Sequence, residues 1–219
     1  MTDFDRHCTE IVAQADLFAD HLDGADVTVA VPSCPGWNVS QLARHVDGGL
    51  RWAREIVAGR VSAPPPDAAL RDLSGATGDD PAELAAALRS AGVDLAATLH
   101  ETGADAQMWS PVPGGGSAFY ARRFAHETAV HRADAALALG VDYVVANFVA
   151  VDGVEEWLDW VARHSTSTCI HGCGSCSAPA KRWDCTPPTP VATGSWTSQA
   201  MRSRGAAATK PPLPGCAGR

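Results

Sequence analysis

Apolar residues recur at intervals of three and four along the first 164 residues, and this spacing constrains the fold more than any other feature. The segment from Asp3 to Leu22 shows it most plainly, with apolar side chains at Phe4, Cys8, Ile11, Ala15, Phe18 and Leu22. On an α-helix these side chains share one face, which can be buried while the opposite face stays in water. We therefore predict amphipathic helices, and no strand pattern before residue 160 outweighs them.

Residues typical of helix ends divide this region into five predicted helices. Asn38 precedes the second helix as its N-cap, and Gln41 stands where a capping-box partner is needed. Asp80 and Pro81 begin the third helix, and Gly140 ends the fourth. The fourth and fifth predicted helices are Ser117–Leu139 and Val144–Val161.

The fifth predicted helix has an apolar side that we expect to be buried. It comprises Val154, Trp157, Leu158 and Val161. Helices joined by connections of moderate length favour an up-down bundle. The predicted fold class is therefore all-α: an up-down four-helix bundle with an additional helix.

The composition changes sharply near His164. Residues 1–164 contain 24 acidic and 11 basic residues, whereas residues 165–219 contain one acidic and six basic residues. Leucine falls from thirteen residues to one, and five of the seven cysteines lie after the break. We therefore predict a helical domain at residues 1–164 and an irregular, low-complexity tail at residues 165–219.

Three interpretations of the tail remain open. It is disordered, because it has almost no aliphatic residues to build a core, or it is the product of a frameshift in a GC-rich gene. The remaining option is a disulfide-stapled secreted tail, which conflicts with the lack of a signal-peptide pattern. Cys169, Cys173 and Cys176 have the spacing of some iron–sulfur sites, but no barrel-forming sequence follows them.

The net charge of -8 argues against nucleic acid and anionic membranes as partners. The chain shows no signal-peptide pattern and no apolar run of about 18 residues. We expect a soluble, cytoplasmic monomer or dimer.

Glu127 and His131 are the strongest candidates for functional chemistry. Their i,i+4 spacing places a carboxylate and an imidazole on the same face of the fourth predicted helix. His45 lies on the inward face of the second predicted helix and is a third candidate ligand. Two ligands from one helix and one from another can hold a divalent metal ion and leave a coordination position open.

Simpler interpretations of these residues exist. Glu127 and His131 also fit a solvated helix-surface pair, and an inward histidine is often a hydrogen-bonded core residue. Asp134 can steady the imidazole of His131, or it is a surface carboxylate. His126 and His131 lie five residues apart, so the metalloprotease motif is absent, and His126 faces outward or packs against a neighbour.

Two motifs resemble those of mycothiol-dependent maleylpyruvate isomerases. Residues 31–45, VPSCPGWNVSQLARH, resemble the family's first signature, which ends in a histidine. Residues 123–134, RFAHETAVHRAD, resemble its second signature, Glu-x3-His-x2-Asp. The resemblance covers residues 4–164 and implies a DinB-like metal-binding four-helix bundle.

The resemblance also implies ligands and a reaction. It implies a divalent metal, most often zinc, held by His45, Glu127 and His131, with mycothiol, the actinobacterial thiol, as co-substrate. A metal-bound thiolate would act on a small-molecule electrophile, by cis-trans isomerisation or by thiol transfer. The tail replaces the family's usual small α/β domain, so the alternative is a non-catalytic metal-bound scaffold.

Three further residues have expected roles. Trp37 follows the Pro-Gly turn before His45 and is a candidate to line the site and contact a cofactor, although packing is its ordinary role. Cys8 and Cys34 are interpreted as core or turn thiols, because neither has a partner at the spacing of a catalytic nucleophile.

Overall fold

A computed structural model describes residues 1–64 and 78–168, with side chains described as far as residue 162. These residues belong to one compact unit. Most of the predicted tail, from residue 169 onwards, lies outside the described residues, as do its cysteines. The proposed domain boundary near residue 164 therefore remains a prediction.

The described part of the chain contains five helices: α1 (Asp3–Leu22), α2 (Val39–Gly59), α4 (Pro81–Thr102), α5 (Gly116–Leu139) and α6 (Asn147–Thr168). Local capping sets their starts. The side chain of Asn38 accepts a hydrogen bond from the Gln41 backbone at 2.8 Å, and Gln41 accepts one from the Asn38 backbone. The side chain of Asp80 caps the first turn of α4, and Gly140 ends α5 in the left-handed conformation.

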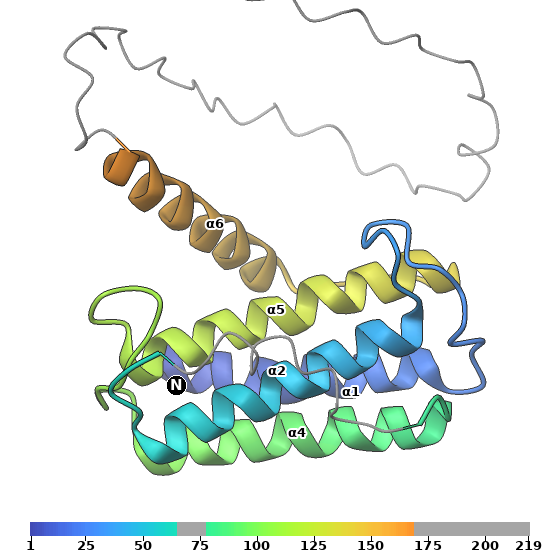
Figure 1. Ribbon diagram of the computed structural model, residues 1–219, viewed down its shortest axis with the longest axis horizontal. Coiled ribbons are helices and arrows are strands. Elements are labelled where there is room, and N and C mark those ends of the chain that lie inside the picture. The colour runs from blue at the N-terminus through green and yellow to red at the C-terminus, as the bar shows by residue number, and fades with distance from the viewer. Residues whose placement is uncertain (65–77, 169–219) are drawn as a thin grey trace, which may run out of the picture. The chain divides into compact units, whose positions relative to one another are not determined.

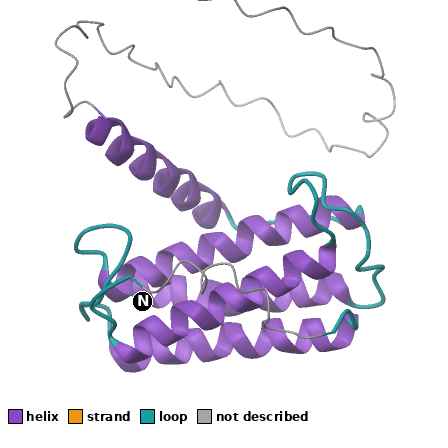
Figure 2. Ribbon diagram, in the orientation of Figure 1, coloured by secondary structure: helices purple, strands orange, loops and turns teal. Residues whose placement is uncertain are grey.

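The first four of these helices form a bundle (Figure 1). Helices α1 and α2 each pack against both α4 and α5, so they occupy opposite corners. The core between them is apolar, and its largest fully buried side chains include Tyr120, Phe18, Ile11, Leu22, Leu42, Leu50, Leu88 and Leu95. Residues 1–64 and 78–168 contain helices and no strand (Figure 2). The predicted all-α fold is confirmed for these residues.

Two local features bring the helices and the site together. A Cβ atom at Gly92 of α4 would lie 2.7 Å from Cβ of Ala15 in α1, so only glycine fits there without a shift. The turn before α2 is fixed by backbone hydrogen bonds from Val31 to Trp37 and from Val39 to Val29. That turn holds Trp37 beside the start of α2.

The predicted buried side of the fifth helix is wrong. Val154, Trp157, Leu158 and Val161 are 56–63% exposed. Instead, α6 turns its acidic residues Asp152 and Glu156 toward α5, where they pair with Arg122 and Arg123. The helix is thus attached to α5 by ion pairs, and its apolar stripe stays largely exposed, although Trp157 lines a cavity shared with α2 and α5.

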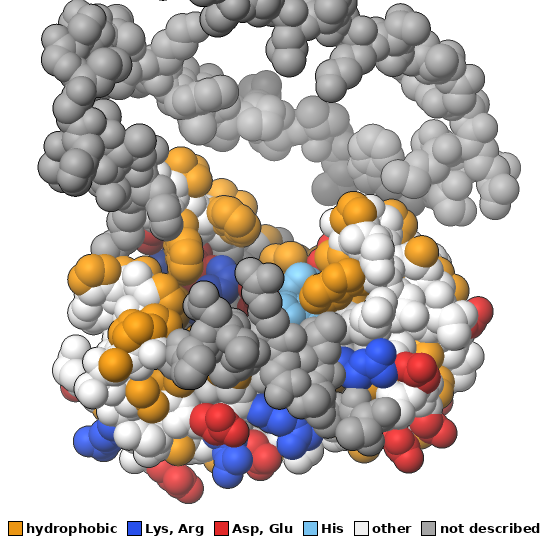
Figure 3. All heavy atoms as spheres, viewed as in Figure 1, with side chains coloured by type: hydrophobic (Ala, Val, Ile, Leu, Met, Phe, Trp, Pro, Cys, Tyr) orange, Lys and Arg blue, Asp and Glu red, His pale blue; other side chains and the backbone are white. Residues whose placement is uncertain are grey.

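Among the described helices, none is both long and apolar enough to cross a bilayer. In the space-filling view, histidine side chains reach the surface beside hydrophobic ones (Figure 3).

Candidate metal centre

Helices α2 and α5 bring His45, Glu127 and His131 together. Nε2 of His131 lies 3.1 Å from Oε1 of Glu127, and Nε2 of His45 lies 3.6 Å from the same oxygen. One possible ligand atom from each residue lies within 4.8 Å of the others. The imidazoles of His45 and His131 stand edge to face, with ring centroids 5.1 Å apart. Residues far apart in the sequence thus converge on one carboxylate oxygen.

The geometry of this donor set fits a divalent metal. Two metal bonds of about 2.0–2.1 Å at a tetrahedral angle place their ligand atoms about 3.3 Å apart. The distances of 3.1 and 3.6 Å around Glu127 lie on either side of that value. Two imidazole nitrogens and one carboxylate oxygen are a donor set found in catalytic zinc sites. Metal binding itself remains a prediction.

The second nitrogen of His131 also has a partner. Nδ1 of His131 lies 2.9 Å from Oδ2 of Asp134. An acceptor at Nδ1 holds a proton there, so Nε2 can give its lone pair to a metal ion held between it and Glu127. Asp134 therefore occupies the position expected of a residue that orients a ligand.

Arg123 balances the charge of Glu127 from the other side. Its Nη2 donates a hydrogen bond of 2.7 Å to Oε2 of Glu127, so Oε1 is left to face the two imidazoles. Burial disfavours the charged carboxylate, but His131, His45 and Arg123 together hold the pKa of Glu127 well below its usual range. Burial likewise opposes protonation of His131, yet Glu127 and Asp134 raise its pKa. Glu127 is therefore an anion ready to bind a cation.

Cys34 lies at this site, which sequence reasoning missed. Its Sγ donates to Oδ2 of Asp134 across 3.7 Å, and Cys34, His131 and Asp134 offer atoms within 4.8 Å of one another. Burial and the charge of Asp134 raise the pKa of the thiol, so Cys34 stays neutral. The sequence feature that could have predicted this placement is the position of Cys34 in the turn before His45. Cys8, in contrast, is fully buried in the core as expected.

Trp37 lies beside His45. The two ring centroids are 5.0 Å apart in an edge-to-face arrangement. Glu127 also lines a cavity of about 340 Å³, so a small molecule can approach the carboxylate from outside.

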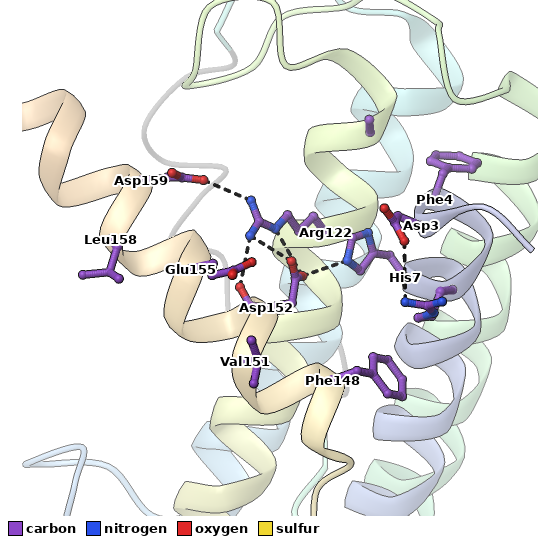
Figure 4. A pocket seen from close by; sticks show the side chains of 12 residues that line it. Asp3, Phe4, His7, Arg122, Phe148, Val151, Asp152, Glu155, Leu158 and Asp159 are labelled. Atoms are coloured by element: carbon purple, nitrogen blue, oxygen red, sulfur yellow. Dashed lines mark hydrogen bonds and ion pairs between the residues drawn. The ribbon is translucent and has the colours of Figure 1, made fainter. Parts of the chain in front are cut away.

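A second group of possible ligands links α1, α5 and α6. Nε2 of His7 lies 2.8 Å from Oδ2 of Asp152, and Arg122 pairs with the same carboxylate (Figure 4). Nε2 of His126 lies 2.6 Å from the same oxygen. These distances are those of hydrogen bonds, shorter than the separation of two metal ligands. We interpret this group as an ion-pair cluster that fixes α6. His126 is buried against His7, so the outward-facing alternative is wrong.

The helical domain matches a known protein family. Residues 8–136 match the family model described as the mycothiol maleylpyruvate isomerase N-terminal domain. The matched range includes His45, Glu127, His131 and Asp134. Neither the curated proteins nor the solved structures gave a match to the chain.

Proposed function

This chain belongs to the mycothiol maleylpyruvate isomerase N-terminal domain family. From this premise we propose that the protein binds a divalent metal, most favourably zinc, and activates a low-molecular-weight thiol. The observation that carries this proposal is the convergence of His45 and His131 on one oxygen of Glu127. The family links the chain to mycothiol, and a small-molecule electrophile is the proposed second substrate.

Each residue of the proposed site has a separate role. His45, Glu127 and His131 would hold the ion, which when bound lowers the pKa of a thiol so that a thiolate exists at neutral pH. Asp134 accepts the proton of Nδ1 and fixes the tautomer of His131. Arg123 restrains Oε2 of Glu127 and keeps Oε1 turned toward the imidazoles. The thiolate would then add to the electrophile, either to permit cis-trans isomerisation or to complete a transfer.

Elemental analysis of the purified protein tests the first part of this proposal. We expect one equivalent of a zinc-like ion in the native protein and none in His131→Ala. His100→Ala is the matched control, because His100 is an exposed histidine on α4 that contacts Phe4 and Asp5 of α1. No metal after reconstitution, or equal metal in both variants, would contradict the proposal.

Cobalt substitution tests the second part without knowledge of the substrate. Addition of mycothiol to the Co²⁺-loaded protein should produce a thiolate-to-cobalt absorption band in the near ultraviolet. Metal without such a band, and without thiol-dependent turnover, would instead favour the alternative of a metal-bound scaffold that catalyses nothing.

A further inference from the structure

The cavity beside Glu127 has aromatic walls. Its volume of about 340 Å³ is at the small end of the range for ligand sites, which suits a molecule of one or two rings. Five aromatic side chains line it: Trp52, Phe119, Phe124, Trp157 and Trp160. They come from α2, α5 and α6, so three helices contribute.

The lining rings pack against one another in tilted pairs. Phe119 and Trp160 lie 6.3 Å apart with an interplanar angle of 36°, and Trp52 and Phe124 lie 6.3 Å apart at 43°. Tilted aromatic faces favour planar, conjugated ligands through stacking and edge contacts. A small flexible acid would gain little from these walls.

The charges in the cavity lead to the same conclusion. Arg123 is the cation of the lining. Its Nη2 is bound to Glu127, and its Nη1 is bound to Glu156, which is 3% exposed. An anionic substrate would therefore have to compete with two carboxylates that the arginine already holds. Apart from the metal ion of the proposed site, a dicarboxylate would find no unpaired cation among the described lining residues and no apolar match.

We propose that this cavity binds a flat, uncharged, conjugated carbonyl compound, such as an aryl enone, in preference to a small dicarboxylate. The inference rests on the proposed function, because the same site must supply the thiolate. The reaction is then thiol addition. The sulfur bonds to the β carbon, the electron pair of the double bond moves to the carbonyl as an enolate, and the thiol proton reaches the α carbon. The product is a saturated thioether, and no oxidant or reductant is consumed.

Calorimetric titration of the metal-loaded full-length protein tests the ligand class. The probes are methyl naphthyl ketone, naphthoate of matched size, and maleate; none needs a thiol to bind. We expect the ketone to bind, naphthoate to bind about tenfold more weakly, and maleate not to bind. Maleate binding more tightly than the ketone would overturn the inference.

Variants on α6 locate the binding site. Trp157 and Leu158 are neighbours with 62% and 63% exposure, but of the two only Trp157 lines this cavity. Trp157→Ala should weaken ketone binding about tenfold, and Leu158→Ala should leave it unchanged. Equal effects of the two substitutions would show that the ketone binds elsewhere, and the inference would fail.

Glu156→Gln tests the charge argument. It removes one of the two carboxylates on Arg123, so naphthoate should bind several-fold more tightly while ketone affinity is unchanged. Circular dichroism verifies that the variant is folded, and unchanged naphthoate affinity in a folded variant would contradict the argument.

Failure of the proposed function is distinguishable from failure of this inference. Ketone binding by a protein that takes up no metal would refute the metal–thiol function but leave the ligand class intact. A metal-loaded protein that activates thiol and binds maleate but not the ketone would refute the ligand class and leave the metal–thiol function intact. Thioether formation from the aryl enone benzylideneacetone and mycothiol, lost in Trp157→Ala and kept in Leu158→Ala, would support both.

Discussion

Oδ2 of Asp134 lies 2.9 Å from Nδ1 of His131, while Nε2 of the same ring faces Glu127. An acceptor in this position sets the tautomer and basicity of a histidine ligand, and its loss typically lowers metal affinity about 10–100-fold. We therefore expect Asp134→Asn to weaken zinc binding by that factor, as measured by competition with a chromophoric chelator.

Asp142→Asn is the control for this substitution, because Asp142 is an exposed carboxylate shortly after α5. It changes the net charge equally and should leave the affinity unchanged. If both substitutions weakened zinc binding by the same factor, Asp134 would act only through its charge, and its orienting role would be refuted.

Arg123 joins Glu127 to the buried Glu156 of α6, and its removal should be costly. Arg123→Met leaves Glu156 buried without its cation, which typically costs about 3–5 kcal/mol of unfolding free energy. The double variant with Glu156→Leu removes the uncompensated charge and should recover most of that loss. Urea unfolding of both variants in the metal-loaded state measures the two values.

Arg89→Met provides the comparison for an exposed arginine. Arg89 pairs with Asp16 and Asp20, whose side chains are 50% and 64% exposed, so the loss should stay below about 1 kcal/mol. A loss in Arg123→Met no larger than in Arg89→Met would mean that the bridge to α6 contributes little.

The close approach of α1 and α4 makes a separate prediction about stability. Gly92→Ala places a methyl group 2.7 Å from Ala15, and overpacking should outweigh the gain in helix propensity by about 1 kcal/mol. Gly59→Ala meets Val61 at an ordinary 3.5 Å and should be neutral or stabilising. Thermal unfolding compares the two, and equal stabilisation would contradict the close packing.

The helices of the bundle were predictable because their signals are local. Asn38 and Gln41 form a capping box within three residues of each other, and the cap that Asp80 provides for α4 is equally local. The pair Glu127 and His131 was predictable for the same reason, since one helical turn fixes which residues share a face. His45 could be added because its helix had a readable apolar face.

The parts that sequence reasoning missed depend on contacts between distant residues. Cys34 meets Asp134 one hundred positions away, and no periodic pattern records such a contact. The orientation of α6 was predicted from its apolar stripe, but ion pairs from Asp152 and Glu156 to α5 determine it instead. Ion pairs leave no hydrophobic periodicity in the sequence, so the apolar stripe did not predict which residues of α6 are buried.

Asp152 gives the attachment of α6 a defined dependence on pH. Burial favours its neutral form, but Arg122, His126 and His7 lower the pKa of Asp152 from 3.8 to about 2. Above pH 3.8 the carboxylate is ionised in the folded and unfolded states, and its interactions stabilise the fold in full. As the pH falls from 3.8 toward about 2, the unfolded state takes up the proton first and this contribution disappears.

Asp152→Asn should therefore cost about 1–2 kcal/mol of unfolding free energy near neutral pH. A pKa lowered by one corresponds to about 1.4 kcal/mol, and water screens part of this because the carboxylate is 28% exposed. The difference from the native protein should stay constant down to about pH 5 and shrink between about pH 4 and pH 2. Urea unfolding of the metal-free proteins across this range measures it.

Asp159→Asn is the control for Asp152→Asn, since Asp159 is 60% exposed and also pairs with Arg122. An exposed pair of this kind contributes little, so its loss should lower the unfolding free energy by less than about 1 kcal/mol at any pH. A difference between Asp152→Asn and the native protein that does not shrink between about pH 4 and pH 2 would show that Asp152 does not stabilise the fold as a carboxylate.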